Sequence, residues 1–100
     1  MKVTVNAIHF AADQKLVDFA EKKLSKLDTF FEGIISAEVI LKVDKPEVAD
    51  NKIAEIKLSI PNSDYLFAKK HADSFEEAVD DSIEALRRQL KKFKEKAQEK

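Results

Sequence analysis

The chain has 100 residues, 44% of them hydrophobic and 37% charged, with one glycine, no cysteine and a formal net charge of −1. This composition fits one domain, residues 1–100, with a hydrophobic core, and it excludes a disordered chain, a disulfide scaffold and thiolate chemistry. The N-terminal stretch is too short and too polar for a signal peptide, and no stretch could span a membrane, so we expect a cytoplasmic protein without a membrane partner.

The first third of the chain predicts a strand and then a helix. Residues 2–8 alternate, with Val3 and Val5 on one side of the strand. Asp13 can cap a helix over residues 14–31, because its carboxylate can accept from free backbone N–H groups. Gly33 follows the helix, where helices commonly stop. The apolar stripe that we expect this helix to bury consists of Leu16, Phe19, Ala20, Leu24, Leu27 and Phe31.

Three further strands are predicted in the middle of the chain, at 34–43, 52–60 and 65–71. Polar turns at 44–51 and 61–64 separate them. Turns this short join antiparallel neighbours, so we expect a meander.

A second helix is predicted over residues 73–96, with Asp73 or Ser74 as its cap. Its first half is acidic and its second half is basic. At ~1.5 Å per residue this helix is too long for a small sheet to cover, so we expect its basic end to project. Residues 97–100 should fray. The apolar stripe consists of Phe75, Val79, Ile83, Leu86, Leu90 and Phe93.

The predicted fold class is an α+β two-layer sandwich with the order β-α-β-β-β-α. The first strand, the helix and the second strand should form a right-handed crossover with parallel strands, which gives a four-stranded mixed sheet. Both helices should cover one face of that sheet, and the other face should be open and polar.

Known catalytic patterns are missing from the sequence. His9 and His71 lack metal-ligand spacing, and neighbouring carboxylates on a helix point ~100° apart, so they form no acid/base pair. The chain has neither a glycine-rich phosphate loop nor a Ser–His–Asp signature. We therefore expect a protein that is not an enzyme, with no metal, no cofactor and no small-molecule substrate.

The basic residues form rows on both helices. The first helix carries a lysine row, and the two rows on the second helix lie beside and beyond its apolar stripe. One row from each helix could border a groove for a phosphate backbone, because a local basic face acts independently of acids farther away than ~10 Å. The alternative is a solvated surface, with pairs such as Glu84–Arg88. The rows are Lys15, Lys22, Lys23 and Lys26; Arg87, Lys91 and Lys94; and Arg88, Lys92 and Lys96.

Aromatic side chains that could stack on bases are not evident in the sequence. Phe75 and Phe93 lie on the predicted buried stripe, and Tyr65 and Phe67 lie in a predicted strand. Without stacking residues, recognition of folded RNA by shape and backbone is favoured over sequence recognition.

Two motifs in register resemble the ribosome hibernation-promoting factors, also called ribosome-associated inhibitors or ribosomal subunit interface proteins. The resemblance covers essentially the whole chain. It departs at Ala7, Asp13 and His71, which lie in predicted turns or strand ends. The motif residues are Asp73, Phe75, Ala78-Val79-Asp80, Ile83, Leu86, Arg88-Gln89-Leu90 and Lys92–Lys96, together with Leu16, Phe19, Lys23, Lys26-Leu27 and Phe30-Phe31 in the first helix.

This resemblance implies a fold like that of double-stranded-RNA-binding domains and a role in ribosome hibernation during stress and stationary phase. Its partners would be the small ribosomal subunit and its ribosomal RNA, and translation would be inhibited by occlusion of the mRNA/tRNA channel. The alternatives are a protein–protein interaction module and a double-stranded-RNA binder unconnected to ribosomes. The residues that the resemblance assigns to RNA binding are Lys22, Lys23, Lys26, Arg87, Arg88, Lys91, Lys92, Lys94 and Lys96.

Overall fold

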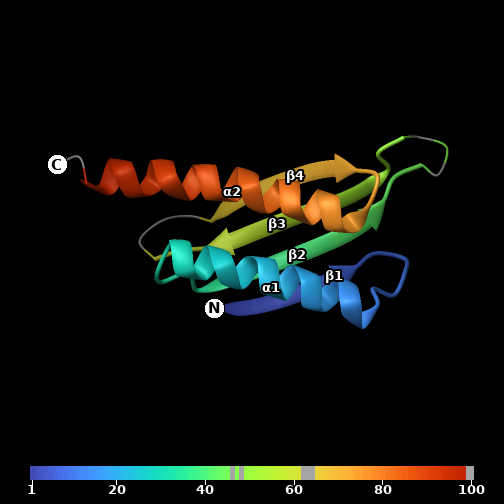
Figure 1. The fold of residues 1–100 in the computed structure, drawn as a ribbon, viewed down its shortest axis with the longest axis horizontal. Coiled ribbons are helices and arrows are strands. Elements are labelled where there is room, and N and C mark those ends of the chain that lie inside the picture. The colour runs from blue at the N-terminus through green and yellow to red at the C-terminus, as the bar shows by residue number, and fades with distance from the viewer. Residues whose placement is uncertain (46, 48, 62–64, 99–100) are drawn as a thin grey trace.

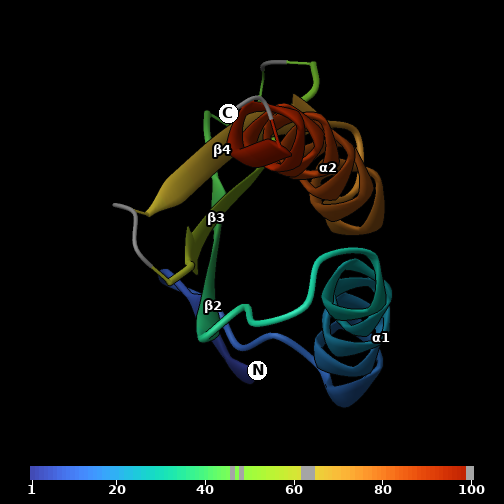
Figure 2. The ribbon, with the colours of Figure 1, turned by 90° about the vertical axis from the view of Figure 1, so that its left-hand side faces the viewer.

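The structure is a computed structural model that describes residues 1–45, 47, 49–61 and 65–98. Four strands form one sheet in the order β1-β2-β3-β4, with β1 parallel to β2 and the other neighbours antiparallel. Both helices lie on the same face of this sheet (Figures 1 and 2). The predicted β-α-β-β-β-α order and two-layer architecture are confirmed. The elements are β1 (Lys2–Ala7), α1 (Gln14–Phe30), β2 (Ser36–Val43), β3 (Lys52–Ser59), β4 (Leu66–Ala72) and α2 (Phe75–Gln98).

The first helix begins at the predicted residue and ends one residue before the predicted end. The Asp13 carboxylate accepts a hydrogen bond of 2.8 Å from the Leu16 N–H, which satisfies one of the free donors of the first turn. The helix ends at Phe30, because Phe31 is already extended although its N–H still reaches the Leu27 carbonyl at 2.9 Å. Gly33 then adopts a φ of 93°, a left-handed conformation that glycine takes without steric cost.

The second helix is capped by Ser74, which decides between the two residues that the sequence left open. The Ser74 hydroxyl accepts from the Glu77 N–H at 3.1 Å. Asp73 instead accepts from the backbone N–H of Asp50, at 3.2 Å, and so ties the start of α2 to the turn between β2 and β3.

Strand boundaries differ from the predictions by one or two residues. β1 stops at Ala7 because His9 adopts a φ of 64°. β2 begins at Ser36, where cross-strand pairing with both Lys2 and Ser59 begins. β4 starts at Leu66 and reaches Ala72, which pairs with Lys52. α2 begins two residues later than predicted and continues to Gln98, so residues 97–98, which we expected to fray, are helical. Residues 46, 48 and 62–64 of the predicted turns and residues 99–100 lie outside the described residues.

The core lies between the sheet and the helices. It contains Leu24 and Leu27 of α1, Leu86 and Leu90 of α2, and alternate residues of the three strands β2 to β4. Ser82, the one polar side chain buried there among the described residues, donates to the Ala54 carbonyl at 3.2 Å. The basic end of α2 extends past the sheet, as its length predicted (Figure 1). This projection gives the molecule an elongated shape of 50 × 24 × 19 Å.

The sheet face away from the helices is open but not uniformly polar, which corrects the sequence-based prediction. Tyr65 is 56% exposed and Phe67 is 46% exposed, so aromatic side chains do reach solvent. The exposure of Phe67 follows from the alternation of side chains along β4. The helix-facing position in β4 is Ala68, so its neighbour Phe67 must point to the other side.

Candidate nucleic-acid interface

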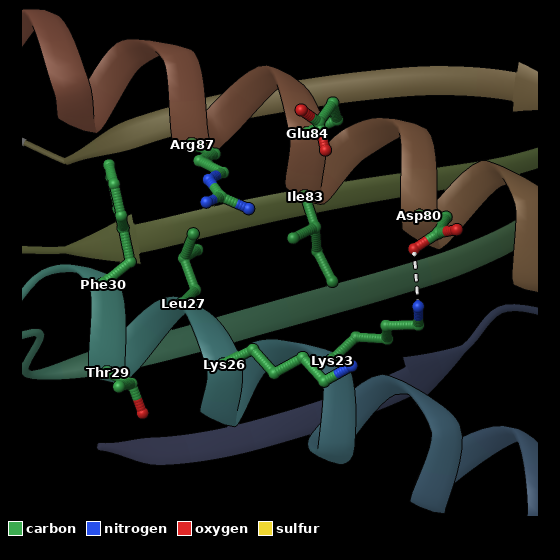
Figure 3. Close-up of a pocket in the computed structure, with 9 residues that line it drawn as sticks. All are labelled: Lys23, Lys26, Leu27, Thr29, Phe30, Asp80, Ile83, Glu84 and Arg87. Carbon is green, nitrogen blue, oxygen red and sulfur yellow. Dashed lines mark ion pairs between the residues drawn. The ribbon is translucent and has the colours of Figure 1, made fainter.

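A groove of 450 Å³ runs between α1 and α2. Figure 3 shows Leu27 and Ile83 facing each other across it, and Arg87 pointing from α2 toward α1. Lys23 and Lys26 contribute to the α1 side. The α1 wall is basic, and the α2 wall carries Arg87 beside two carboxylates, with an apolar floor between the walls. Such a groove can accept a polyanion at its basic rim without burying a charge. The lining residues are Lys23, Lys26, Leu27, Thr29, Phe30, Asp80, Ile83, Glu84 and Arg87.

Helical spacing explains why these residues share one groove. On α1, residues 23, 26 and 30 are three or four apart and therefore lie along one flank, next to the buried stripe. On α2, residues 80, 84 and 87 do the same. Both helices pack on the same sheet face, so these two flanks meet.

An ion pair crosses the groove. The Lys23 ammonium lies 3.3 Å from the Asp80 carboxylate (Figure 3), and both side chains remain partly exposed. Lys23 also lies 5.5 Å from the centre of the Phe19 ring. Lys23 is therefore partly neutralised in the free protein, whereas no ion pair within the described residues holds Lys26 or Arg87.

Phe30, at the last turn of α1, connects the two helices through cations. The Arg87 guanidinium carbon lies 4.9 Å from the ring centre and the Lys94 ammonium lies 5.2 Å from it. Lys94 also donates to the Phe30 carbonyl at 3.4 Å. A cation is favourable at a helix C-terminus, where free carbonyls carry partial negative charge. α1 has no basic residue in its own last turn, so α2 supplies this charge.

A second hollow of 330 Å³ continues from the groove along α2 and is lined by Phe30, Glu84, Arg87, Arg88 and Lys91. Here three cations face one carboxylate, whereas the first groove contains three cations and two carboxylates. Positive charge therefore grows toward the projecting end of α2.

The structure brings together most, but not all, of the residues that the sequence analysis assigned to RNA binding. Lys22, Lys92 and Lys96 are exposed but line neither hollow. The Glu84–Arg88 ion pair, named with the alternative of a solvated surface, is not formed in the part of the chain that the structure describes. Those gathered around the two hollows and Phe30 are Lys23, Lys26, Arg87, Arg88, Lys91 and Lys94.

Sequence reasoning missed two features of this interface. It did not place Phe30 between the helices, although Phe30 follows Lys23 and Lys26 at helical spacing and that pattern could have shown it. It also did not place the acidic residues Asp80 and Glu84 in the groove, whereas both line it. Their rotation toward α1 depends on how the two helices pack.

Within residues 1–45, 47, 49–61 and 65–98, no three His, Cys, Asp or Glu side chains gather closely enough to hold a metal ion. No helix in the same residues combines the length and apolarity needed to cross a bilayer.

The chain is similar in sequence to a known family. Residues 3–98 match the sequence model of the family described as Sigma 54 modulation protein / S30EA ribosomal protein. A ribosome hibernation promoting factor of Pseudomonas putida is 34% identical over 98 residues, which cover 98% of this chain and 91% of that protein. One from Klebsiella oxytoca is 30% identical over 96 residues and covers 96% of both chains.

Solved structures show the same fold. A ribosomal subunit interface protein from Coxiella burnetii superposes with a TM-score of 0.82 at 23% identity and covers 94% of this chain and 98% of its own. The N-terminal domain of Protein Y from Thermus thermophilus gives a TM-score of 0.78 at 24% identity, covering 93% of this chain and 99% of its own.

Proposed function

This chain belongs to the Sigma 54 modulation protein / S30EA ribosomal protein family, and we propose that it is a ribosome hibernation factor. It binds the small ribosomal subunit in the channel that mRNA and tRNA would use, and it inhibits translation by occluding that channel. It acts in the cytoplasm under stress or in stationary phase. The observation that carries this proposal is the basic groove between α1 and α2, with its extension along the projecting end of α2.

The groove suits a folded RNA backbone more than a protein partner. Two cations of α2, Arg87 and Lys94, sit over the Phe30 ring at the end of α1, so they are held close to the α1 side of the groove. Arginine can bind a phosphate with two parallel hydrogen bonds, and lysine acts as a mobile point charge. The net charge of −1 does not prevent this, because charges farther apart than ~10 Å are largely screened.

Occlusion follows from the shape of the domain. The sheet and its two helices form one packed body of 50 × 24 × 19 Å, and the cations of the groove lie on its helix side. When those cations hold ribosomal RNA phosphates, the rest of the domain occupies the channel that mRNA and tRNA would use. No catalytic step is required.

Charge reversal on α2 tests the proposal. The variant Arg88→Glu with Lys92→Glu should co-sediment with purified small subunits at least tenfold more weakly, and the dependence of binding on salt should become shallower by about two contacts. Translation in a reconstituted system should resist the variant at concentrations where the parent protein inhibits.

The matched control is Lys15→Glu with Lys45→Glu. Both residues are exposed and line neither hollow, although Lys15 belongs to the lysine row of α1. They lie in the first turn of α1 and in the turn after β2, at the end of the domain where α2 begins (Figure 1). This control makes the same change in net charge and should bind like the parent. Unchanged, salt-insensitive binding of the α2 variant would contradict the proposal. Equal affinity of the parent for isolated duplex RNA and for small subunits would favour a general double-stranded-RNA binder.

A further inference from the structure

The open face of the sheet carries a second basic and aromatic surface, on the side away from both helices. Strand alternation places Lys57 on this side, because its neighbours Ile56 and Leu58 are fully buried against the helices. Phe67 pairs directly with Lys57 across the strands. Tyr65 lies next to both, since the Lys57 ammonium sits 4.0 Å from the centre of its ring.

The two rings are available to a ligand. Tyr65 is 56% exposed and Phe67 is 46% exposed, and they are two positions apart, which is ~6.8 Å along an extended chain. Each ring can therefore take a flat partner of its own. Lys57 holds Tyr65 by a cation–π contact, which orders the ring before anything binds.

The charges around the rings favour an anionic partner. Lys42 is neutralised by Glu55 at 2.6 Å. Among the described residues, Lys2, Lys57 and Lys69 have no carboxylate within ion-pair distance. Lys2 and Lys57 also line a hollow of 290 Å³, whose other polar side chains are Thr4, Ser36, Glu38 and Ser59. The hollow therefore holds two ammonium groups, three hydroxyl groups and one carboxylate, that of Glu38, which pairs with Lys57 across the strands. The ammonium groups outnumber the carboxylate, and together with the hydroxyl groups they can bind the phosphates and sugars of a nucleic acid.

We propose that this open face is a binding site for single-stranded RNA, with bases stacked on Tyr65 and Phe67 and the backbone held by Lys57, Lys2 and Lys69. A four-stranded sheet with exposed aromatics is a common platform for unpaired bases, because every base has a flat face that stacks without regard to sequence. The site goes beyond the proposed function. It lies on the opposite side of the sheet from the inter-helix groove, so one domain could hold folded RNA and an unpaired strand at once.

The intrinsic fluorescence of the protein provides a direct test. The chain contains one tyrosine and no tryptophan, so all useful emission comes from Tyr65. We expect a short oligouridylate to quench this emission in a saturable way, because a stacked base lies against the ring. The same length of duplex RNA should leave the emission unchanged, since its bases are already stacked on one another.

Variants separate stacking from general attraction. Phe67→Ala should weaken oligouridylate binding about tenfold, within the range reported for loss of one stacked base. Val43→Ala shortens an apolar side chain of similar exposure, 44%, outside the proposed site and should have no effect. Lys57→Gln should weaken binding and reduce its dependence on salt by about one contact. Arg88→Glu with Lys92→Glu should keep the quenching, because it changes only the helix side.

Three results would overturn the proposal. The first is the absence of saturable quenching by the oligouridylate. The second is quenching that Phe67→Ala and Lys57→Gln leave unchanged. The third is a change in Tyr65 emission on raising the protein concentration without RNA, together with a dimer in sedimentation, because the face would then bind a second copy of the chain.

Discussion

Removing the carboxylate of Asp80 should strengthen binding to the small subunit, although the change breaks an ion pair. Asp80 holds Lys23 at 3.3 Å inside the groove, so it competes with any phosphate that approaches this lysine. Asp80→Asn frees the ammonium and also removes a negative charge from the groove wall. Both consequences should tighten binding. The loss of the ion pair should slightly lower the stability of the free protein.

The expected size follows from Coulomb's law. A phosphate that contacts Lys23 would lie about 6 Å from the Asp80 carboxylate, where repulsion costs about 0.7 kcal/mol in water and about 2.8 kcal/mol at an effective dielectric constant of 20. The groove is open to solvent, so the smaller figure dominates and binding should tighten about three- to tenfold at low salt. The salt dependence should steepen by about one contact.

The cost in stability should be small. The pair is partly exposed, with side-chain accessibilities of 31% for Lys23 and 53% for Asp80. Exposed pairs contribute about 0.2–1 kcal/mol, which corresponds to a fall in Tm of about 1–5 °C for a domain of this size. Calorimetry of the free protein measures this loss of stability separately from binding.

Co-sedimentation with purified small subunits over a range of salt concentrations is the assay. Glu21→Gln is the control, because Glu21 is an exposed carboxylate on α1 that does not line the groove, and its removal changes the net charge equally. Weaker or unchanged binding by Asp80→Asn, or an equal gain from Glu21→Gln, would refute the reasoning that the groove holds phosphates near Lys23.

Two further predictions concern the stability of the free protein. A hydrogen bond with Asp73 and the charge of Asp73 raise the pKa of the exposed Asp50 carboxyl above its ordinary value of 3.8. Protonation is therefore easier in the folded state, and the contribution to stability is present in acid and lost as pH rises through the raised pKa. Asp50→Asn should thus raise the Tm at neutral pH and have little effect in acid. Asparagine also suits the φ of 55° at this position. A Tm difference that does not depend on pH would contradict this explanation. Leu86→Ala removes a fully buried side chain from the core and should lower the free energy of unfolding by about 2–5 kcal/mol in a urea titration, whereas a loss below about 1 kcal/mol would mean that the core collapses around the gap.

Much of the fold could be predicted from local sequence patterns, because local physics determines those features. Asp13 can accept from its own helix wherever that helix lies, so its role as N-cap was predictable. The alternation in β1 and the apolar stripe of α2 determine which side of each element is buried. Short connections determine which strands are neighbours, and those neighbours are confirmed.

The candidate site was predictable only in part. Lys23, Lys26 and Arg87 could be placed on helix flanks from their spacing, because helical periodicity alone determines the flank. The contacts between the two flanks could not be predicted. They depend on the rotation and separation of two helices that pack through a shared core. That packing places Asp80 against Lys23, and Lys94 on the carbonyl of Phe30.

The sequence by itself determined the order of the elements, the N-cap of the first helix, the buried faces and the presence of basic rows. Only the tertiary structure decided that acidic side chains share the groove with these rows, and that Tyr65 and Phe67 reach solvent on the opposite face. The physical reason is that periodicity determines the direction of a side chain relative to its own element. What that side chain meets is determined by packing between elements that are distant in the chain.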